Sequence, residues 1–255
     1  MPFPCGVAPT PTDLMAHWAF DETAGRVVSD SVGGRDGVLV GGPVWQPDSG
    51  KIGGALKLDG ISDFVVTDVL LDPADGPFSV YAWIKSGAPG EAVLSQDGAD
   101  WLLTDPANGQ LTTGLKGTGQ SASSLYSKKA VTDGNWHHVG LVWDGANRTL
   151  YVDGIAVATD RLTAPAGSFG GLIIGAGRNL EPATAFGTFG FWICFGFRIW
   201  RHDPLAEKSS RRARGRSGAR PIRMDRTGPW GALGGQVRPE GAAGGYFLDF
   251  LSPIE

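Results

Sequence analysis

The fold is decided by the stretch Trp136-His-His-Val-Gly-Leu-Val-Trp-Asp-Gly-Ala-Asn-Arg-Thr-Leu-Tyr-Val-Asp-Gly-Ile-Ala-Val-Ala-Thr159. Two apolar runs, 149–152 and 155–159, meet across Asp153-Gly154. A two-residue Asp-Gly loop between such runs is typical of a type I′ β-hairpin, because both central residues need φ > 0. Turn residues at 144–147 join this hairpin to a further β-favouring run at 136–143. The stretch therefore predicts three consecutive antiparallel strands.

Short β-favouring runs separated by turn residues continue on both sides of this stretch. The predicted strands cover 55–59, 64–67, 78–85, 91–96, 101–104, 110–115, 172–174 and 189–200. In the run 78–85, small and aliphatic residues alternate with Tyr81 and Trp83, so both faces of this strand are partly covered. Strands every 8–12 residues without intervening helices predict an all-β, two-sheet antiparallel sandwich.

Composition agrees with many turns and few helices. Of the 255 residues, 40 are glycine, roughly twice the average share of ~7%, without the Gly-X-Y period of collagen. Because glycine destabilises helix interiors, long helices are not expected. No apolar run reaches the ~18–20 residues of a membrane helix, and Met1–Cys5 shows no signal-peptide features. Whether Cys5 and Cys194 pair stays open, and two cysteines exclude a disulfide-dense scaffold.

Charge divides the chain near residue 205. Residues 1–205 contain 13 basic and 21 acidic side chains, and residues 206–255 contain 9 basic and 5 acidic ones, so the net charges are −8 and +4. We therefore predict a leader or linker at 1–13, one β domain at 14–205, and an irregular C-terminal tail at 206–255 that is basic and then Gly/Pro-rich. The arginines of this tail are not interleaved with aromatic residues, which argues against nucleic-acid binding.

Four segments in order resemble motifs of one family. They are His17–Gly25 with Asp30-Ser31 and Gly37-Val-Leu39; Gly53–Gly60 with Asp63-Phe-Val65; Phe78–Lys85; and Trp136-His-His-Val139 with Leu150-Tyr-Val-Asp-Gly154. Together, over roughly residues 14–200, the chain resembles the laminin-G-like (concanavalin A-like lectin/glucanase) jelly-roll domains of the bacterial extracellular type. The resemblance implies a jelly-roll sandwich that acts outside the cell or at its surface, beside other domains of a longer polypeptide.

The closing segment departs from the family pattern. The Phe-Arg-Ile-Trp core is kept at 197–200, but Phe195 and Gly196 stand where the family usually has two acidic residues. Two interpretations stay open for the C-terminal part of the chain: a solvated, disordered basic tail, or a gene end that is read out of frame after about residue 185.

Catalytic patterns are weak in this sequence. A glycoside hydrolase needs two carboxylates beside the scissile bond, and on a strand these would stand at i and i+2. Glu22, Glu91 and Glu181 have no acidic partner at i±2. His137 and His138 are consecutive in a strand and face opposite ways, as one packed and one exposed histidine would. We expect a non-catalytic module, with a glycoside hydrolase or a purely structural spacer domain as alternatives.

Binding is the expected role, and its candidate residues are few. Trp45, Trp101 and Trp143 are candidate stacking platforms for sugars, although we expect at least two of them in the core. Asp100 matches the laminin-G aspartate that ligates calcium just before a strand, and Asn179 is the candidate second ligand; the alternative is that Asp100 caps a turn. The resemblance thus implies Ca²⁺ as the cofactor and carbohydrate or a cell-surface protein as the partner.

Overall fold

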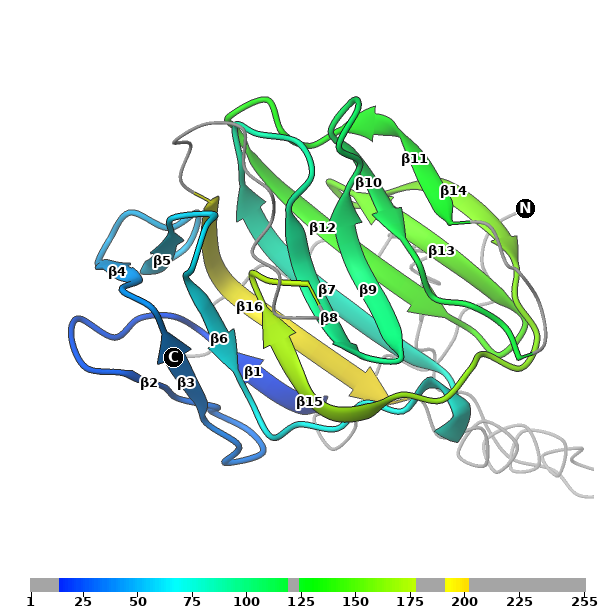
Figure 1. Ribbon diagram of the computed structural model, residues 1–255, viewed down its shortest axis with the longest axis horizontal. Helices are drawn as coiled ribbons and strands as arrows, with labels where there is room; N and C mark the ends of the chain where they lie inside the picture. The colour runs from blue at the N-terminus through cyan, green and yellow to red at the C-terminus, as the bar shows by residue number, and fades with distance from the viewer. Residues whose placement is uncertain (1–13, 119–123, 178–190, 202–255) are drawn as a thin grey trace, which may run out of the picture. The chain divides into compact units, whose positions relative to one another are not determined.

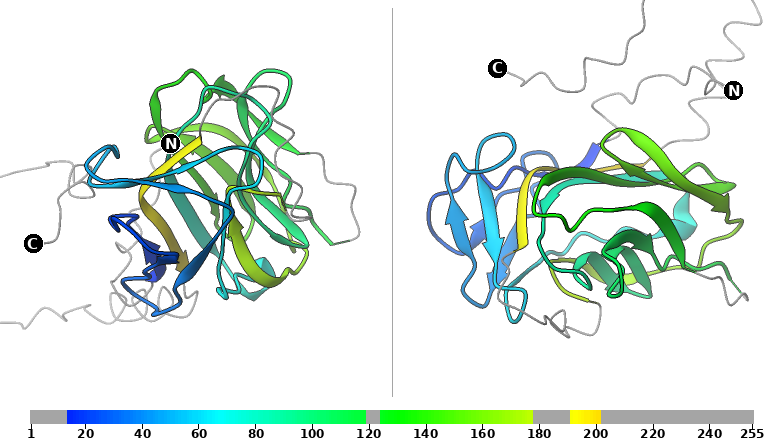
Figure 2. Two further views of the ribbon diagram at one scale, coloured as in Figure 1. Left: turned by 60° about the vertical axis from the view of Figure 1, so that its left-hand side comes forward. Right: turned by 90° about the horizontal axis from the view of Figure 1, so that it is seen from above.

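The computed structural model describes residues 14–118, 124–177 and 191–201, the last of these in backbone only. These residues form a sandwich of two antiparallel β-sheets (Figure 1), and the right panel of Figure 2 shows one sheet on either side of the core. The predicted all-β jelly-roll fold is confirmed. The predicted leader 1–13 and tail 206–255 lie outside the described residues, so these boundaries stay predictions.

Each sheet contains eight strands. Sheet A has the order β14 (Ile155–Arg161), β13 (Asn147–Val152), β12 (Trp136–Trp143), β7 (Phe78–Lys85), β16 (Phe191–Arg201), β5 (Ala55–Leu58) and β4 (Val44–Gln46), and β1 (Leu14–Trp18) pairs with β16. Sheet B has the order β11 (Leu125–Ala130), β10 (Gln110–Thr113), β9 (Ala99–Thr104), β8 (Ala92–Asp97), β15 (Phe169–Ile174), β6 (Phe64–Val66), β3 (Gly37–Val40) and β2 (Val27–Val28).

The Asp-Gly hairpin forms where the sequence predicts it. Val152 pairs with Ile155, and the two turn residues between them have positive φ, 52° at Asp153 and 78° at Gly154. The second turn is fixed by the Asp144 carboxylate, which accepts hydrogen bonds from the amides at 146 and 147. Strands β12, β13 and β14 are therefore consecutive neighbours in sheet A, as predicted.

Short strands are the elements that the sequence pattern misses. β1, β2, β3, β4 and β11 are not among the predicted strands; β2 and β4 contain two and three residues, too few for a periodic pattern. The described residues include no α-helix and one 3₁₀ turn, Pro73–Asp75, capped by the side chain of Asp72. No helix among the described residues is long and apolar enough to cross a membrane.

Aromatic side chains and one arginine join the two sheets. Phe78 of β7 packs edge-on against Trp101 of β9, with ring centroids 5.0 Å apart. Arg148 of β13 is 2% exposed, donates two hydrogen bonds of 2.7 Å to the carboxylate of Asp160, and donates another to the backbone carbonyl of Leu115. These three hydrogen bonds stabilise the buried guanidinium and link β13 to β14 and to the chain after β10.

Strand β16 carries an irregularity at the segment that departs from the family pattern. Against β7, Cys194 pairs with Trp83 and Arg198 pairs with Tyr81, so four residues of β16 span two of β7. The extra residues include Phe195 and Gly196. The strand therefore keeps its central place in sheet A by means of a bulge.

Candidate functional site

The outer face of sheet A is lined by alternate residues of its strands. In β7, Phe78, Val80, Ala82 and Ile84 are fully buried in the core, while the residues between them face outward. Register then fixes which residues of β12 and β13 share that outer face. The outward residues of these three strands are Ser79, Tyr81, Trp83 and Lys85; Trp136, His138, Gly140 and Val142; and Asn147, Thr149 and Tyr151.

Four aromatic rings form a continuous row on this face. The rings of Tyr81 and His138 are stacked, with centroids 5.4 Å apart and planes inclined by 7°. Trp83 lies 5.0 Å from His138 on one side, and Tyr151 lies 6.3 Å from Tyr81 on the other. We call Trp83, His138, Tyr81 and Tyr151 the aromatic row. Each ring is only partly exposed, so the row is a surface of packed ring faces and edges.

A glycine makes room for the row. Gly140 pairs with Tyr81 on one side and with Tyr151 on the other. A Cβ at Gly140 would stand 2.3 Å from Cδ1 of Tyr81, so the tyrosine ring lies across a position that only glycine leaves open. Burial, together with the neighbouring Tyr151, raises the pKa of Tyr81, and burial followed by the charge of Asp144 raises the pKa of Tyr151. Both phenols therefore stay neutral at physiological pH and keep a hydrogen-bond donor.

One lysine contacts the Trp83 end of the row, and two others lie on the same face of sheet A. The Nζ of Lys51, in the loop before β5, lies 5.6 Å from the centre of the Trp83 ring. Lys85 follows Trp83 on the same face of β7, and Lys57 lies at an outward position of β5. Lys51 thus packs over the Trp83 ring at this end of the row.

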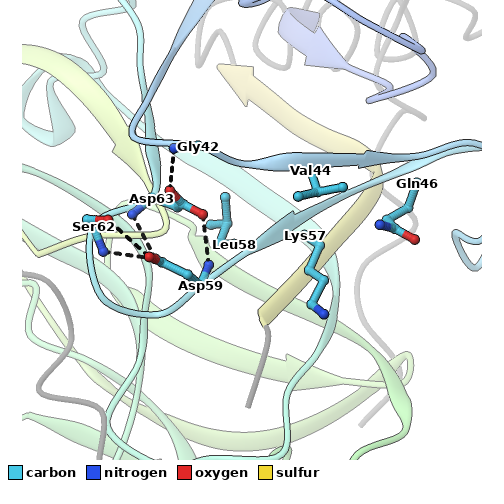
Figure 3. A pocket seen from close by; sticks show the side chains of 8 residues that line it. All are labelled: Gly42, Val44, Gln46, Lys57, Leu58, Asp59, Ser62 and Asp63. Atoms are coloured by element: carbon cyan, nitrogen blue, oxygen red, sulfur yellow. Dashed lines mark hydrogen bonds between the residues drawn. The ribbon is translucent and has the colours of Figure 1, made fainter. Parts of the chain in front are cut away.

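An open hollow of about 420 Å³ lies against strands β4 and β5. It is lined by Gly42, Val44, Gln46, Lys57, Leu58, Asp59, Ser62 and Asp63. Figure 3 shows the two acids hydrogen-bonded at one end of the hollow, with Lys57 and Gln46 at the other.

The acids of the hollow hold its loop together. One carboxylate oxygen of Asp59 accepts from the amides of Ile61, Ser62 and Asp63, and Asp63 accepts from Gly42 and Asp59. Partial burial is the largest influence and raises the pKa of Asp59, but the backbone hydrogen bonds together lower it. Asp59 and Asp63 therefore stabilise the loop by accepting hydrogen bonds from backbone amides. Neither acid of the hollow is arranged as a catalytic carboxylate.

A second cluster of titratable groups surrounds His137. Its Nδ1 lies 2.9 Å from Asp153 and its Nε2 lies 3.0 Å from Asp133, while Lys129 lies 2.5 Å from the same oxygen of Asp153. His137 is 6% exposed. Since both ring nitrogens face carboxylates, neither is left to activate a nucleophile. The cluster joins the loop before β12 to the hairpin turn, and His137 is the packed member of the predicted packed-and-exposed pair.

Hydrogen bonding sets the pKa values of the two acids of this cluster. The backbone amide of Asn135 is the largest influence that lowers the pKa of Asp133 to about 2. For Asp153, partial burial is the largest influence and raises the pKa, but Lys129, His137 and the amide of His138 together lower it. Both carboxylates are therefore ionised across the physiological range.

Glu91 is a buried acid away from the aromatic row. Its side chain lies in the loop between β7 and β8, is 4% exposed, and leaves Oε2 without a hydrogen-bond partner. Burial raises the pKa of Glu91 to about 7, against the opposing hydrogen bond with Ser86. A lone buried carboxyl at 4% exposure has no access to a substrate.

Two of the three candidate tryptophans lie in the core, as expected. Trp101 is fully buried and Trp143 is 6% exposed, with its indole N–H donating to the carbonyl of Leu162 at 2.8 Å. Both rings fill the core between the sheets, so neither offers a face to a sugar. Trp45 is partly exposed, packs against the core, and donates to the carbonyl of Gly25 at 3.0 Å. As a ligand platform, Trp45 stays a prediction.

The predicted calcium ligands are not brought together in the described residues. Asp100 is the second residue of β9 rather than a loop residue before it, and its backbone carbonyl accepts from the amide of Gly114. Asn179 lies outside the described residues. Within 14–118, 124–177 and 191–201, no three His, Cys, Asp or Glu side chains gather as a metal site. The calcium site at Asp100 stays a prediction.

The aromatic row is the site that sequence reasoning missed. Tyr81 and Trp83 were already placed on the second face of their strand, but their link to His138 and Tyr151 was not recognised. The pattern that could have revealed the row is the alternation of outward-facing residues in three strands, together with Gly140, which pairs with both Tyr81 and Tyr151. An outward glycine between two outward aromatics in a paired register indicates a ring lying over the backbone.

Solved structures with the same fold include binding domains of botulinum neurotoxins. The chain aligns with the binding domain of botulinum neurotoxin DC in complex with SialylT at 14% identity and a TM-score of 0.56, covering 80% of this chain and 51% of that one. It aligns with the serotype D binding domain at 13% identity and a TM-score of 0.58, covering 81% and 52%. At such identities the likeness concerns the fold alone, and this chain spans about half the length of these structures. No curated protein matches the chain in sequence.

A family model matches more than half of the chain. The match covers residues 59–188, which include strands β6 to β15 and every member of the aromatic row. The predicted resemblance is confirmed by this match and by the jelly-roll topology. The chain belongs to the concanavalin A-like lectin/glucanase superfamily, in its Laminin_G_3 family.

Proposed function

We propose that this protein is a non-catalytic carbohydrate-binding module that works outside the cell or at its surface, and that the aromatic row is its binding face. One observation carries the proposal: four rings, Trp83, His138, Tyr81 and Tyr151, lie in a continuous row on the outer face of sheet A. Sugars present C–H faces that pack on aromatic rings, and their hydroxyls take hydrogen bonds from the ring edges.

The chemistry of the row suits such a ligand. The phenols of Tyr81 and Tyr151 are neutral at physiological pH, and burial raises their pKa values further, so the row carries hydroxyl groups as well as ring faces. The rings hold one another in place through the stack on His138, which lowers the entropy lost on binding. The row runs across three strands, a length that favours an extended saccharide over a single sugar.

The structural neighbours support a binding role. They are described as binding domains, and one of them was solved in complex with SialylT. Family members with this fold include lectins as well as glucanases, so the fold alone does not decide between binding and hydrolysis. Extracellular location is part of the proposal and rests on the family and on the toxin domains.

The residues that flank the aromatic row argue against hydrolysis of a bound sugar. A glycosidase needs two carboxyl groups facing the scissile bond. Along the described strands of sheet A whose side chains are placed, the outward residues include no aspartate or glutamate. Glu91 is buried in a loop, and Asp59 and Asp63 are engaged by backbone amides. Binding without turnover is the function that this arrangement favours.

Removal of single rings tests the proposal. We expect Trp83→Ala and Tyr151→Ala to weaken binding to soluble polysaccharides in affinity gel electrophoresis by about tenfold or more, as expected for loss of stacking at a binding hot spot. Tyr126→Ala and Phe169→Ala are matched controls, because these rings are 48% and 66% exposed on strands of sheet B. The controls are expected to bind as the unaltered protein does.

The same assay can overturn the proposal. If no polysaccharide in a panel of neutral and acidic polymers binds, the module is a spacer or recognises a protein. If the sheet B controls lose binding while the sheet A variants keep it, the ligand face is wrong. Release of reducing sugar from a bound polymer would contradict the non-catalytic assignment.

A further inference from the structure

The hollow beside β4 and the aromatic row lie on the same face of sheet A. Trp45 packs against the core, so its neighbours Val44 and Gln46 in β4 point to the outer face. Both residues line the hollow. Tyr81 and Trp83 point to the same outer face from β7, between core residues that are fully buried. A ligand on this face can therefore meet both the row and the hollow.

Paired residues place the row on two neighbouring lines across the sheet. On the first line, Gly140 pairs with Tyr81 on one side and with Tyr151 on the other. On the second line, two residues further along β7, Trp83 pairs with His138. The row therefore advances along β7 as it crosses the sheet from β13.

A third line leads from β7 to the hollow. Lys85, two residues beyond Trp83, pairs with position 192 of β16. Position 192 pairs in turn with Lys57 of β5, and Lys57 pairs with Val44 of the hollow. The three lines form one diagonal from the aromatic row to the hollow, which we call the binding track.

Strand geometry gives the length of the binding track. Its ends are Tyr151 on β13 and Val44 on β4, and the order β13-β12-β7-β16-β5-β4 puts them five strand spacings apart, which is about 24 Å. From the line of Tyr81 to the line of Lys85, the track also advances four residues along β7, or about 13 Å. The two components combine to about 27 Å, close to the length of an extended hexasaccharide and far beyond that of a disaccharide.

The hairpin that forms the hollow touches the aromatic row. The loop that joins β4 to β5 contains Lys51, whose Nζ lies 5.6 Å from the centre of the Trp83 ring. Because β16 lies between β5 and β7 in the sheet, this contact reaches across β16. The row and the hairpin of the hollow are therefore in direct contact.

The ring planes turn along the row. The rings of Tyr81 and His138 are parallel within 7°, but Trp83 is inclined by 42° to His138, and Tyr151 is inclined by 54° to Tyr81. A flat crystalline polymer surface needs coplanar rings. A single glycan chain, whose successive units are rotated about the chain axis, suits rings that turn.

We propose that the ligand is one extended β-1,4-linked glycan chain, which lies along the binding track and ends in the hollow. This inference rests on the proposed carbohydrate-binding function and names its ligand class. Equatorial β-1,4 linkages keep a pyranose chain straight, as a diagonal of constant direction requires, whereas α-1,4 linkages coil it. The C–H faces of the pyranose units in such a chain pack on aromatic rings.

The hollow has the size and the surface to hold the end of the chain. Its volume of about 420 Å³ lies within the range of small-molecule sites, about 300–1,000 Å³. Val44 is 53% exposed and offers an apolar contact, and Gln46 carries amide donors and an acceptor for hydroxyl groups. Figure 3 shows both residues on β4, away from the hydrogen-bonded Asp59 and Asp63.

Chain length and linkage are tested by isothermal titration calorimetry. We expect at least one of the β-1,4-linked chains cellohexaose and chitohexaose to bind the unaltered protein about tenfold or more tightly than its own trisaccharide, because only the longer chain reaches from the row to the hollow. Maltohexaose has the same number of units but α-1,4 linkages, and is expected to bind no more tightly than the trisaccharide.

A double variant assigns the extra affinity to the hollow. Val44→Ala with Gln46→Ala is expected to lower the affinity for the hexasaccharide by about tenfold, to that of the trisaccharide, and to leave trisaccharide binding unchanged. Trp83→Ala is expected to weaken the binding of both. Val27→Ala with Gln110→Ala is the matched control, because both residues lie on strands of sheet B and Val27 is 48% exposed.

Each outcome decides one claim. A hexasaccharide that binds no more tightly than its trisaccharide, with both lost in Trp83→Ala, overturns the binding track and leaves the carbohydrate module standing. Maltohexaose binding as tight as that of the β-1,4-linked chains overturns the linkage. A double variant that keeps the full hexasaccharide affinity removes the hollow from the site. Binding to other polysaccharides of the neutral and acidic panel, but to neither β-1,4-linked chain, overturns the ligand class alone, whereas binding to no saccharide contradicts the proposed function itself.

Discussion

The ring of Tyr81 lies over the backbone of Gly140, so that a Cβ on the glycine would stand 2.3 Å from Cδ1 of the tyrosine. The two residues are direct partners in the pairing of β7 with β12. Glycine in a strand interior normally weakens a sheet, and here the aromatic ring covers the bare backbone. The position of Tyr81 in the aromatic row therefore depends on the absence of a side chain on the next strand.

Gly140→Ala is expected to displace the Tyr81 ring and to disturb its stack on His138. We expect a loss of unfolding free energy of about 1–3 kcal/mol, typical of overpacking, together with weaker polysaccharide binding. Urea unfolding and affinity electrophoresis measure the two effects. Gly42→Ala is the matched control, because a Cβ there meets nothing within 4 Å. An unchanged affinity in Gly140→Ala would show that Tyr81 does not touch the ligand.

Glu91 is expected to make the protein less stable as pH rises. Its pKa is raised by burial to about 7 in the folded state, so the folded chain holds this proton more tightly than the unfolded chain. The free energy of unfolding should therefore fall between the ordinary glutamate pKa and about pH 7, by up to about 3 kcal/mol, and then level off. Glu91→Gln should remove this slope. Urea unfolding at several pH values gives the difference, and parallel slopes in the two proteins would contradict the prediction.

Asp153 is expected to make the protein less stable as pH falls. The pKa of Asp153 is lowered in the folded state by Lys129, His137 and the amide of His138 acting together against partial burial. Its contribution is present above the ordinary aspartate pKa and is lost as pH falls through the lowered value. Asp153→Asn keeps the positive φ of 52°, which asparagine tolerates. The variant should be less stable at pH 7, with a smaller further loss at about pH 3. Equal stability at pH 7 would contradict this role.

Calcium is tested by thermal unfolding in EDTA and then in excess Ca²⁺. The calcium hypothesis predicts a higher Tm with Ca²⁺, because a ligand that binds only the folded state stabilises it. Asp100→Ala should abolish that rise while leaving the Tm in EDTA close to the original. The same Tm in EDTA and in Ca²⁺ for both proteins would remove the hypothesis.

Local turn chemistry explains what could be predicted of the fold. The Asp153-Gly154 hairpin follows from two adjacent residues that tolerate positive φ, and the structure has both of them there. Strands of two or three residues, such as Val27–Val28, carry no period and form because neighbouring strands pair with them. Long alternating strands are therefore readable from the chain, and short edge strands are not.

The site depends on relations that no single stretch contains. Tyr81, Gly140 and Tyr151 become neighbours only through the register of three strands. The sequence predicts that at least two of Trp45, Trp101 and Trp143 lie in the core, but not which two, because it does not say which face of a strand meets the other sheet. The sequence names aromatic residues as candidates, and tertiary register decides which of their rings are exposed.

The first strand and the last strand of the described sandwich are partners. Leu14 of β1 pairs with Trp200 of β16, so the point where the chain enters the sandwich lies about 5 Å from the point where it leaves. A domain whose ends lie this close together can be inserted into a surface loop of another protein without separating the two ends of that loop. Insertion of the domain between two residues of an unrelated carrier protein should leave both the domain and the carrier folded, which makes this domain a natural cassette for building composite proteins.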